Sequence, residues 1–338
     1  MTPKSGARAR ERIDSRPYQE ALTLFAIAAL GVVFILMGGY MQWLTGFVLV
    51  YLIQGYVAWF LFSKCNQPFY GYAFTMAIGA YATIVPTEVY GWPLWLAILL
   101  GGALSSLAAS ALYVATSRAR GFYVGMVSFL LTILFPSVIE AMRDITGGRS
   151  GMSFGGLTRE IGYEPTLWLL LGVVLAVSIL LFWLLRTKTG RILISIAEND
   201  QLARSVGINT FTYKLLAFSI AGFLSGLGGG LYVSYVGSIS SIDLNVTVTL
   251  YITFIPIIGG TRVPYGPLLG TLFIKLVPEA LASIERYLDM IFGATFIFVV
   301  LGLPGGIGNY LERQWNRISV HVRSRSRGAP LTDTTSAR

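Results

Sequence analysis

Long apolar stretches recur along almost the whole chain, and short polar breaks separate them. Ten stretches can be marked, at residues 21–37, 40–62, 69–85, 93–116, 122–140, 166–185, 213–236, 244–258, 264–282 and 287–303. Most are close to the ~20 residues that an α-helix needs to cross the hydrocarbon core of a bilayer. In lipid, every backbone N–H and C=O must be bonded within the protein, which a helix achieves by itself. The pattern therefore predicts an all-α membrane bundle of about ten transmembrane helices.

The composition agrees with this fold class and excludes several functions. Hydrophobic residues make up 54% of the chain and charged residues 12%, with a mean hydropathy of +0.67, whereas soluble domains carry ~25% charged residues. The single Cys65 and the single His321 leave no ligand set for a metal. The sequence has no GxxxxGK(S/T) phosphate loop, and no nucleophile is paired with a base in an apolar stretch. We expect no catalytic residue, cofactor or metal site.

Charges in the breaks predict the orientation of the chain. With a cytoplasmic N-terminus, 20 of the 25 basic residues fall in inner breaks and tails, while the outer breaks hold seven acidic and four basic residues. The net charge of +9 therefore reports topology rather than nucleic-acid binding. The basic start looks like that of a signal peptide, but the long run after it favours an uncleaved anchor. We expect a cytoplasmic arm 1–19, a membrane domain 20–304 and a cytoplasmic basic tail 305–338.

The long outer loop, residues 141–165, divides the spans into two sets of five, which predicts a 5+5 inverted repeat although no sequence repeat is visible. The third span of each half is interrupted, by Gln67-Pro68 and Gly71 in the first and by Pro256 and Gly259-Gly260 in the second. Broken helices in matching positions point to a solute path. The candidate path residues are Gln67, Tyr70, Gly71, Tyr72, Asn245, Thr249 and Thr253.

Three smaller patterns concern packing and charge. Gly222, Gly226 and Gly230 recur at four-residue spacing in the seventh span, which favours close helix packing over solute contact. Polar residues inside spans, such as Gln54, are expected to form interhelical hydrogen bonds. Lys275 and Glu279 lie one turn apart in the ninth span. They could neutralise each other or be functional, and the first interpretation is favoured.

The inner loop 186–211 contains a predicted surface helix at 196–206. Ser195 and Glu198 match a capping box, and Gly207 suits the C-terminal cap. Ile196, Asn199, Ala203 and Val206 would share one face. This helix could dock into a groove on a cytoplasmic partner or rest on lipid headgroups, and the sequence leaves both interpretations open.

Several runs, found in order between residues 65 and 310, resemble branched-chain amino acid ABC transporter permeases of the LivM type. They are GFYVGMVSFLL, ITGGRSGMS, GRILISIAENDQLARSVGINTFTYKLLAFSIAGFLSGLGGGLY, GPLLGTLFIKLVPE and LPGGIG. The resemblance implies that the 186–211 loop couples the chain to an ATPase through Gly190, Arg191, Ile196, Ala197, Glu198, Asn199, Ala203, Arg204 and Gly207. It also matches Gly147 and Gly148 to the family's outer-loop glycine pair.

The resemblance implies a set of partners in the bacterial inner membrane. These are two cytoplasmic ATP-binding subunits that hold ATP and Mg²⁺, a second related permease, an extracytoplasmic solute-binding protein and membrane lipid. Branched-chain amino acids are the expected solute. The sequence departs from the family at Phe69 and Tyr72, where members have Ser and His, so urea, amides or another small organic solute stay open. A self-sufficient secondary transporter or channel is the alternative, although no midplane carboxylate supports ion coupling.

Overall fold

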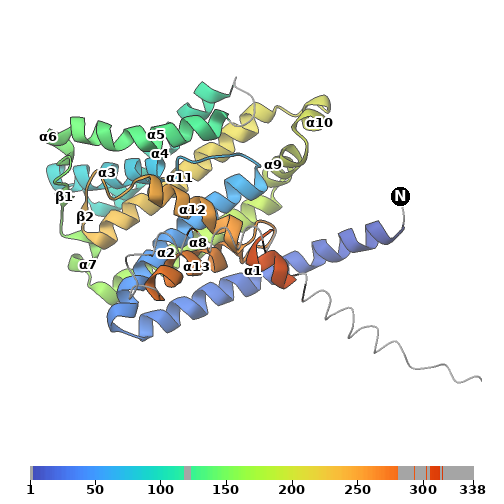
Figure 1. Cartoon of the computed structure of the whole chain (residues 1–338), viewed down its shortest axis with the longest axis horizontal. Helices are drawn as coiled ribbons and strands as arrows, with labels where there is room; N and C mark the ends of the chain where they lie inside the picture. The colour runs from blue at the N-terminus through green and yellow to red at the C-terminus, as the bar shows by residue number, and fades with distance from the viewer. Residues whose placement is uncertain are drawn as a thin grey trace, which may run out of the picture.

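The computed structural model describes residues 3–117, 123–280, 293, 302, 305–312 and 314, with side chains from residue 17 onward. Helices run side by side along one axis and form a bundle (Figure 1). The long helices are α1 (Pro3–Leu36), α2 (Gly39–Trp59) with the π-helical turn η1 (Phe60–Lys64), α3 (Tyr72–Tyr90), α4 (Leu94–Thr116), α5 (Tyr123–Ala141), α8 (Tyr163–Arg186) and α11 (Thr210–Val236). Shorter ones are α6 (Arg143–Thr146), α7 (Gly156–Glu160), α9 (Lys188–Glu198), α10 (Asp200–Ser205), α12 (Val246–Gly259) and α13 (Gly266–Ala280).

Helices occupy the first nine of the ten predicted stretches. Of the tenth, 287–303, the structure describes only residues 293 and 302, and most of the tail also lies outside the described residues. Among the described residues, six helices are long and apolar enough to cross a membrane, namely α1 from Pro17, α2 with η1, α4, α5, α8 and α11. At 1.5 Å per residue, the 14-residue α12 is only ~21 Å long. The all-helical class is confirmed, and ten crossings stay a prediction.

Helix α2 forms the centre of the bundle. In the most apolar 18-residue stretch of α2 and η1, 94% of the residues are buried. The corresponding share is 22% in α1 and 28% in α5, which lie at the periphery. Around α2 pack α1, α8, α11, α12 and α13. The outer helices instead expose large apolar side chains, such as Leu107 on α4 and Leu134 on α5, as expected for surfaces that face lipid.

Small residues bring α3, α4 and α11 into backbone contact. A Cβ on Gly229 would collide with the Met76 carbonyl of α3, and one on Gly226 would collide with Ser105 of α4. On the facing helix, a Cβ on Gly79 would collide with the backbone of Gly226. The predicted packing role of the glycine stripe in the seventh span is therefore confirmed.

The two ends of the bundle differ. At one end lie α9 and α10, and the N-terminal part of α1 extends beyond the bundle on the same side (Figure 1). At the other end, strand β1 (Met152–Ser153) pairs antiparallel with β2 (Ser238–Ile239), and α6 and α7 lie beside them. Gly147, with φ of +71°, makes the turn before β1 where any Cβ would collide with the Gly151 carbonyl. Gly147 and Gly151 thus fold the 141–165 loop onto the segment before α12.

Candidate solute path and coupling loop

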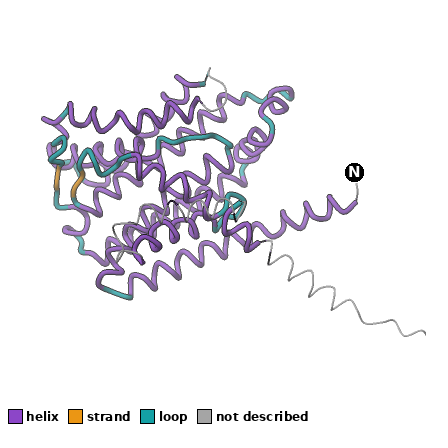
Figure 2. The backbone as a smooth tube through the Cα atoms, in the orientation of Figure 1, coloured by secondary structure: helices purple, strands orange, loops and turns teal. Residues whose placement is uncertain are grey.

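Residues 65–71 have no regular secondary structure, and this mostly extended segment between η1 and α3 runs alongside the helices in Figure 2. Seven residues span at most about 25 Å, a large part of the membrane thickness. Pro68 and Gly71 explain why no helix forms here, since proline lacks a donor and glycine has low helix propensity. α3 therefore begins at Tyr72 rather than at the predicted residue 69. Irregular backbone at membrane depth is tolerated only where protein or a water-filled cavity surrounds it.

Side chains from other helices satisfy the backbone of this segment. The Tyr70 N–H donates to Ser128 Oγ on α5 (2.9 Å), and the Tyr70 carbonyl accepts from Thr132 Oγ1 (3.2 Å). Where α3 begins, the Ala73 N–H donates to Thr249 Oγ1 of α12 (2.9 Å). The two interrupted helices therefore meet directly, through a hydrogen bond that fills an otherwise free donor at a helix start.

The candidate path residues on α12 lie on successive turns. Asn245 is the N-cap, and its Oδ1 accepts from the Thr247 N–H (2.9 Å). Thr253 donates back to the Thr249 carbonyl (2.8 Å). Gln67 is buried and bonds within its own segment, to the Cys65 and Asn66 carbonyls (3.2 Å each). The structure thus brings Thr249 to the α3 start but gives Asn245 a capping partner of its own.

Phe69 and Tyr72, the aromatic residues at the positions where the family has Ser and His, lie in a packed cluster near the start of α3. Phe69 makes edge contacts with Tyr72 (4.9 Å between ring centroids) and with Phe218 of α11 (5.6 Å). Tyr113 of α4 stacks on the Phe218 ring (4.9 Å). Phe69 and Tyr72 are buried, so these two side chains contribute to the core of the bundle.

A buried network of polar side chains joins four helices. Ser225 Oγ of α11 donates to Gln54 Oε1 of α2 (2.9 Å), while Gln54 Nε2 donates to the Ser225 carbonyl (2.9 Å). Ser225 Oγ also lies 2.8 Å from Thr75 Oγ1 of α3, and Ser105 of α4 donates to the Thr75 carbonyl (2.7 Å). The interhelical role predicted for Gln54 is confirmed.

The 186–211 loop forms two short helices instead of the one predicted at 196–206. α9 begins after Thr187, whose Oγ1 accepts from the Gly190 N–H (3.3 Å). Ser195 lies inside α9, where its hydroxyl donates to the Ile192 carbonyl (2.8 Å). The predicted capping box of Ser195 and Glu198 is therefore wrong.

Asn199 separates the two helices. Its backbone is extended (φ −156°, ψ 100°), and its Oδ1 accepts from the Leu202 N–H at the start of α10 (3.0 Å). Asparagine is a preferred N-cap, which explains why the helix restarts here. Gly207, with φ of +84°, donates to the Arg204 carbonyl (3.0 Å), so its predicted role at the C-terminal cap is confirmed.

Charged groups hold α10 against the start of α11. Asp200 accepts from Arg204 (2.8 Å) and lies 3.3 Å from the Lys214 ammonium. Arg204 Nε also donates to Thr210 Oγ1 (3.0 Å). At the end of α9, Asn66 Nδ2 donates to the Ala197 carbonyl (3.2 Å). The two-helix loop is therefore joined both to α11 and to the extended segment 65–71.

The predicted coupling residues divide by exposure. The exposed ones are Arg191, Glu198, Asn199, Arg204 and Gly207. Ala197 is partly buried. The residues buried against the bundle are Gly190, Ile196 and Ala203. Leu202 and Val206, 62% and 69% exposed, are large apolar side chains on the outer surface of the loop. The sequence prediction missed Leu202 and placed Val206 on one face with Ile196 and Ala203, which are buried, because it carried one helix through Asn199. The Asn199-Asp200 pair was the signal for a new helix start.

Lys275 and Glu279 do not form the predicted pair. The ion pairs among the described residues do not include either side chain. Glu279 instead accepts a hydrogen bond from the Tyr40 hydroxyl, and the Lys275 ammonium lies 3.3 Å from the centroid of the Tyr51 ring.

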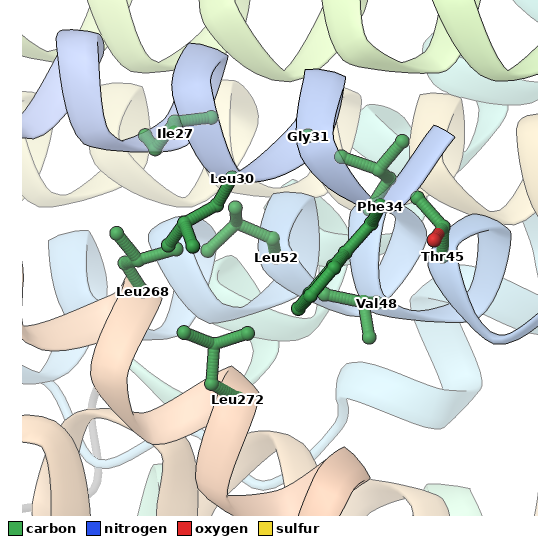
Figure 3. A pocket seen from close by; sticks show the side chains of 10 residues that line it. Ile27, Leu30, Gly31, Phe34, Thr45, Val48, Leu52, Leu268 and Leu272 are labelled. Atoms are coloured by element: carbon green, nitrogen blue, oxygen red, sulfur yellow. The ribbon is translucent and has the colours of Figure 1, made fainter. Parts of the chain in front are cut away.

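A cavity between α1, α2 and α13 has an almost wholly apolar lining (Figure 3). Its residues are Ile27, Leu30, Gly31, Phe34, Thr45, Val48, Leu49, Leu52, Leu268 and Leu272. The one hydroxyl, that of Thr45, donates to the Met41 carbonyl (2.6 Å). This lining offers nothing to a polar solute.

Interrupted helices at the centre of an apolar bundle and a structured loop at one end define the class: a multi-pass membrane transport component. Residues 21–300 match the family described as branched-chain amino acid transport system, permease component. The chain belongs to this family. It is the permease of an ABC importer in the bacterial cell membrane; permeases of this family have no catalytic activity or cofactor of their own, and the ATPase is a separate subunit.

Three similar proteins indicate the range of the family. The LivM permease of the high-affinity branched-chain amino acid transport system of Salmonella typhimurium is 24% identical over 87% of this chain and 76% of its own length. The autoinducer 2 import permease LsrC of Photorhabdus luminescens is 27% identical over 42% of this chain and 44% of its own. The ribose import permease RbsC of Haemophilus influenzae is 27% identical over 60% and 65%. No solved structure matches the chain.

Proposed function

We propose that this permease moves a branched-chain amino acid into the cell by alternating access, driven by a separate ATPase dimer. The observation that carries the solute class is the similarity to LivM, which covers 87% of the chain. The similarities to LsrC and RbsC are shorter, and they make a sugar-like solute the second candidate. An extracytoplasmic binding protein would deliver the solute, and a second related permease would complete the membrane unit.

The proposed membrane unit has ten spans, both termini in the cytoplasm and a 5+5 inverted repeat. Two features support this arrangement. α9, α10 and the N-terminal arm lie at the same end of the bundle (Figure 1). α3 and α12, which would be equivalent in the two halves, meet through the bond from Ala73 to Thr249. Half-helices that meet inside a bundle are typical of solute sites in transporters with inverted repeats.

Coupling would run from the exposed side chains of α10 into the bundle. Leu202 and Val206 would dock in a groove of the ATPase, as apolar anchors do at protein interfaces. Because Asp200 bonds Arg204 and lies beside Lys214, displacement of α10 would move the start of α11. The bond from Asn66 to Ala197 would carry the same movement to the extended segment and to the α3 start.

The docking proposal is tested by co-purification. The tagged chain would be expressed with its genomic neighbours and isolated in detergent as wild type, as Leu202→Arg with Val206→Arg, and as the control Arg159→Glu, an exposed residue of α7 at the opposite end. We expect wild type and control to retain an ATPase subunit and the double variant to lose at least ~90% of it, since buried charge without a partner costs several kcal/mol. Equal recovery in all three would contradict the proposed docking surface.

A further inference from the structure

Lys275 lies in an apolar helix without an acidic partner among the described residues. It belongs to α13, and its ammonium lies over the Tyr51 ring of α2 (3.3 Å) and near the Phe47 ring (5.8 Å). A charge within a membrane helix is costly, and such residues usually pair or take part in transport. Glu279, the carboxylate one turn away, is engaged by Tyr40 instead. The charge of Lys275 therefore needs another explanation.

A second polar group on the same face of α13 is also unpaired. Thr271 lies one turn before Lys275, and residues four apart share a helix face. Its side chain is fully buried, and its hydroxyl has no hydrogen-bond partner in the part of the chain that the structure describes. Other threonines in the bundle, such as Thr253 and Thr83, donate to the carbonyl four residues before them. Thr271 has no such bond, so its hydroxyl is free to donate to a ligand.

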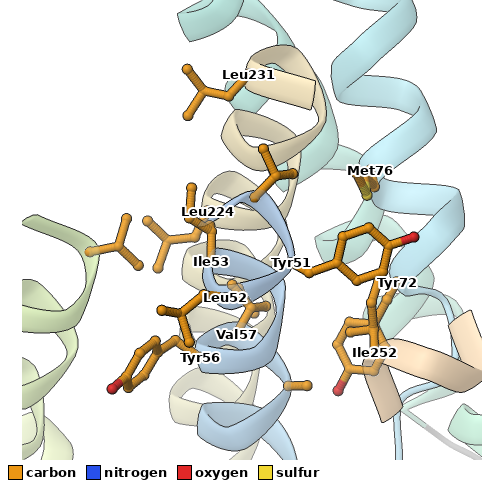
Figure 4. Close-up of a cluster of buried hydrophobic side chains, with 14 of the residues drawn as sticks. Tyr51, Leu52, Ile53, Tyr56, Val57, Tyr72, Met76, Leu224, Leu231 and Ile252 are labelled. Carbon is orange, nitrogen blue, oxygen red and sulfur yellow. The ribbon is translucent and has the colours of Figure 1, made fainter. Parts of the chain in front are cut away.

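The two groups meet a seam formed by three helices. Gly55 lets α2 pack closely against α13 and α12 beside Thr271, because a Cβ there would lie only 3.1 Å from Thr271 Oγ1 and 2.7 Å from Ile255 of α12. Tyr51 lies one turn before Gly55 on α2. Figure 4 shows the Tyr51 ring extending from α2 toward Met76 of α3. The seam thus adjoins both interrupted helices.

We propose that Lys275 and Thr271 form a carboxylate-binding site on the solute path. The inference rests on the proposed importer function and names the group of the solute that the permease recognises. A carboxylate would accept from the Lys275 ammonium and from the Thr271 hydroxyl, one turn apart on α13. Charge-assisted hydrogen bonds of this kind are stronger than contacts between neutral groups. The Tyr51 ring holds the ammonium when no carboxylate is present, through a weaker cation–π contact.

The test measures binding separately from transport. The intact complex of permeases and ATPase subunits would be placed in phosphatidylcholine nanodiscs, and tritiated leucine binding would be measured without the binding protein. Competitors would be 4-methylpentanoate, which keeps the carboxylate, and leucinamide, which lacks it. The variants are Lys275→Met, Lys275→Arg and Thr271→Val, with Glu279→Gln as the neighbouring control.

We expect Lys275→Met to weaken leucine binding about 10-fold or more and Thr271→Val severalfold, while Lys275→Arg and Glu279→Gln stay near wild type. The acid should compete and the amide should not. Unchanged binding in Lys275→Met, or equal competition by leucinamide, would overturn the site. The comparison of competitors needs only the wild type, so it tests recognition of the carboxylate even if a variant fails to assemble. If wild type binds no carboxylate, the site is also overturned, whereas ATP-dependent uptake of another solute by the same complex would leave the importer function intact.

Discussion

Gly229 shows how one missing side chain sets the distance between two helices. Its Cα faces the Met76 carbonyl, so α11 and α3 touch through their backbones. The four-residue spacing of Gly222, Gly226 and Gly230 was enough to predict close packing of the seventh span. The contact of Gly229 with α3 could not be predicted, because sequence spacing identifies a small face but not the helix that meets it.

Two alanine substitutions separate packing from helix propensity. Gly229→Ala should destabilise the protein by about 1–3 kcal/mol, since the new methyl group has no space against a rigid backbone. Gly172→Ala, on an exposed face of α8 with no atom within 4 Å, should be neutral or stabilise by up to ~1 kcal/mol. Melting of the two variants in detergent, followed by size-exclusion chromatography, checks the difference. Equal melting temperatures would mean that α3 and α11 do not pack this closely.

At the scale of elements, the extended segment 65–71 connects the loop of α9 and α10 with the start of α3. Asn66 is the one non-glycine with positive φ (50°) among the described residues, and its side chain bonds Ala197. At the other end of the segment, Ala73 bonds Thr249. The segment contains the only cysteine of the sequence, Cys65, which is buried. The chain therefore carries a natural reporter for movement of this segment.

Cys65 should react slowly with a maleimide in the wild type and at least several-fold faster in Asn66→Gly. Glycine keeps the positive φ but removes the bond to Ala197, so the segment should open more often. Mass spectrometry of the labelled chain gives both rates, and identical rates would remove the segment from the coupling route.

The elements themselves were largely predictable, and their irregular connections were not. Helices at Leu94–Thr116 and Tyr123–Ala141 match the predicted spans to within about a residue at each end, because apolar length alone defines a membrane helix. The break at Asn199 was missed because several residues in this loop can cap a helix. In the structure the N-caps are Thr187 and Asn199, and Ser195 is not one of them. The orientation of Lys275 toward Tyr51 depends on how α13 is rotated against α2, which sequence spacing does not fix.

On the scale of the whole molecule, the structure links an exposed loop at one end to interrupted helices inside the bundle. The buried hydrogen bonds among Gln54, Ser225 and Thr75 join α2, α11 and α3. A movement that begins at α10 would therefore shift several helices at once rather than one. This arrangement suits a permease that a separate ATPase drives, and it assigns no energy-coupling group to the chain itself.

The central claim is tested most directly by leucine uptake into proteoliposomes that contain the permeases, the ATPase subunits and the binding protein. We predict accumulation that requires internal ATP and falls to background when a Walker A lysine of the ATPase is replaced. ATP-independent leucine uptake by vesicles that hold this chain alone would contradict the importer mechanism and establish a self-sufficient carrier.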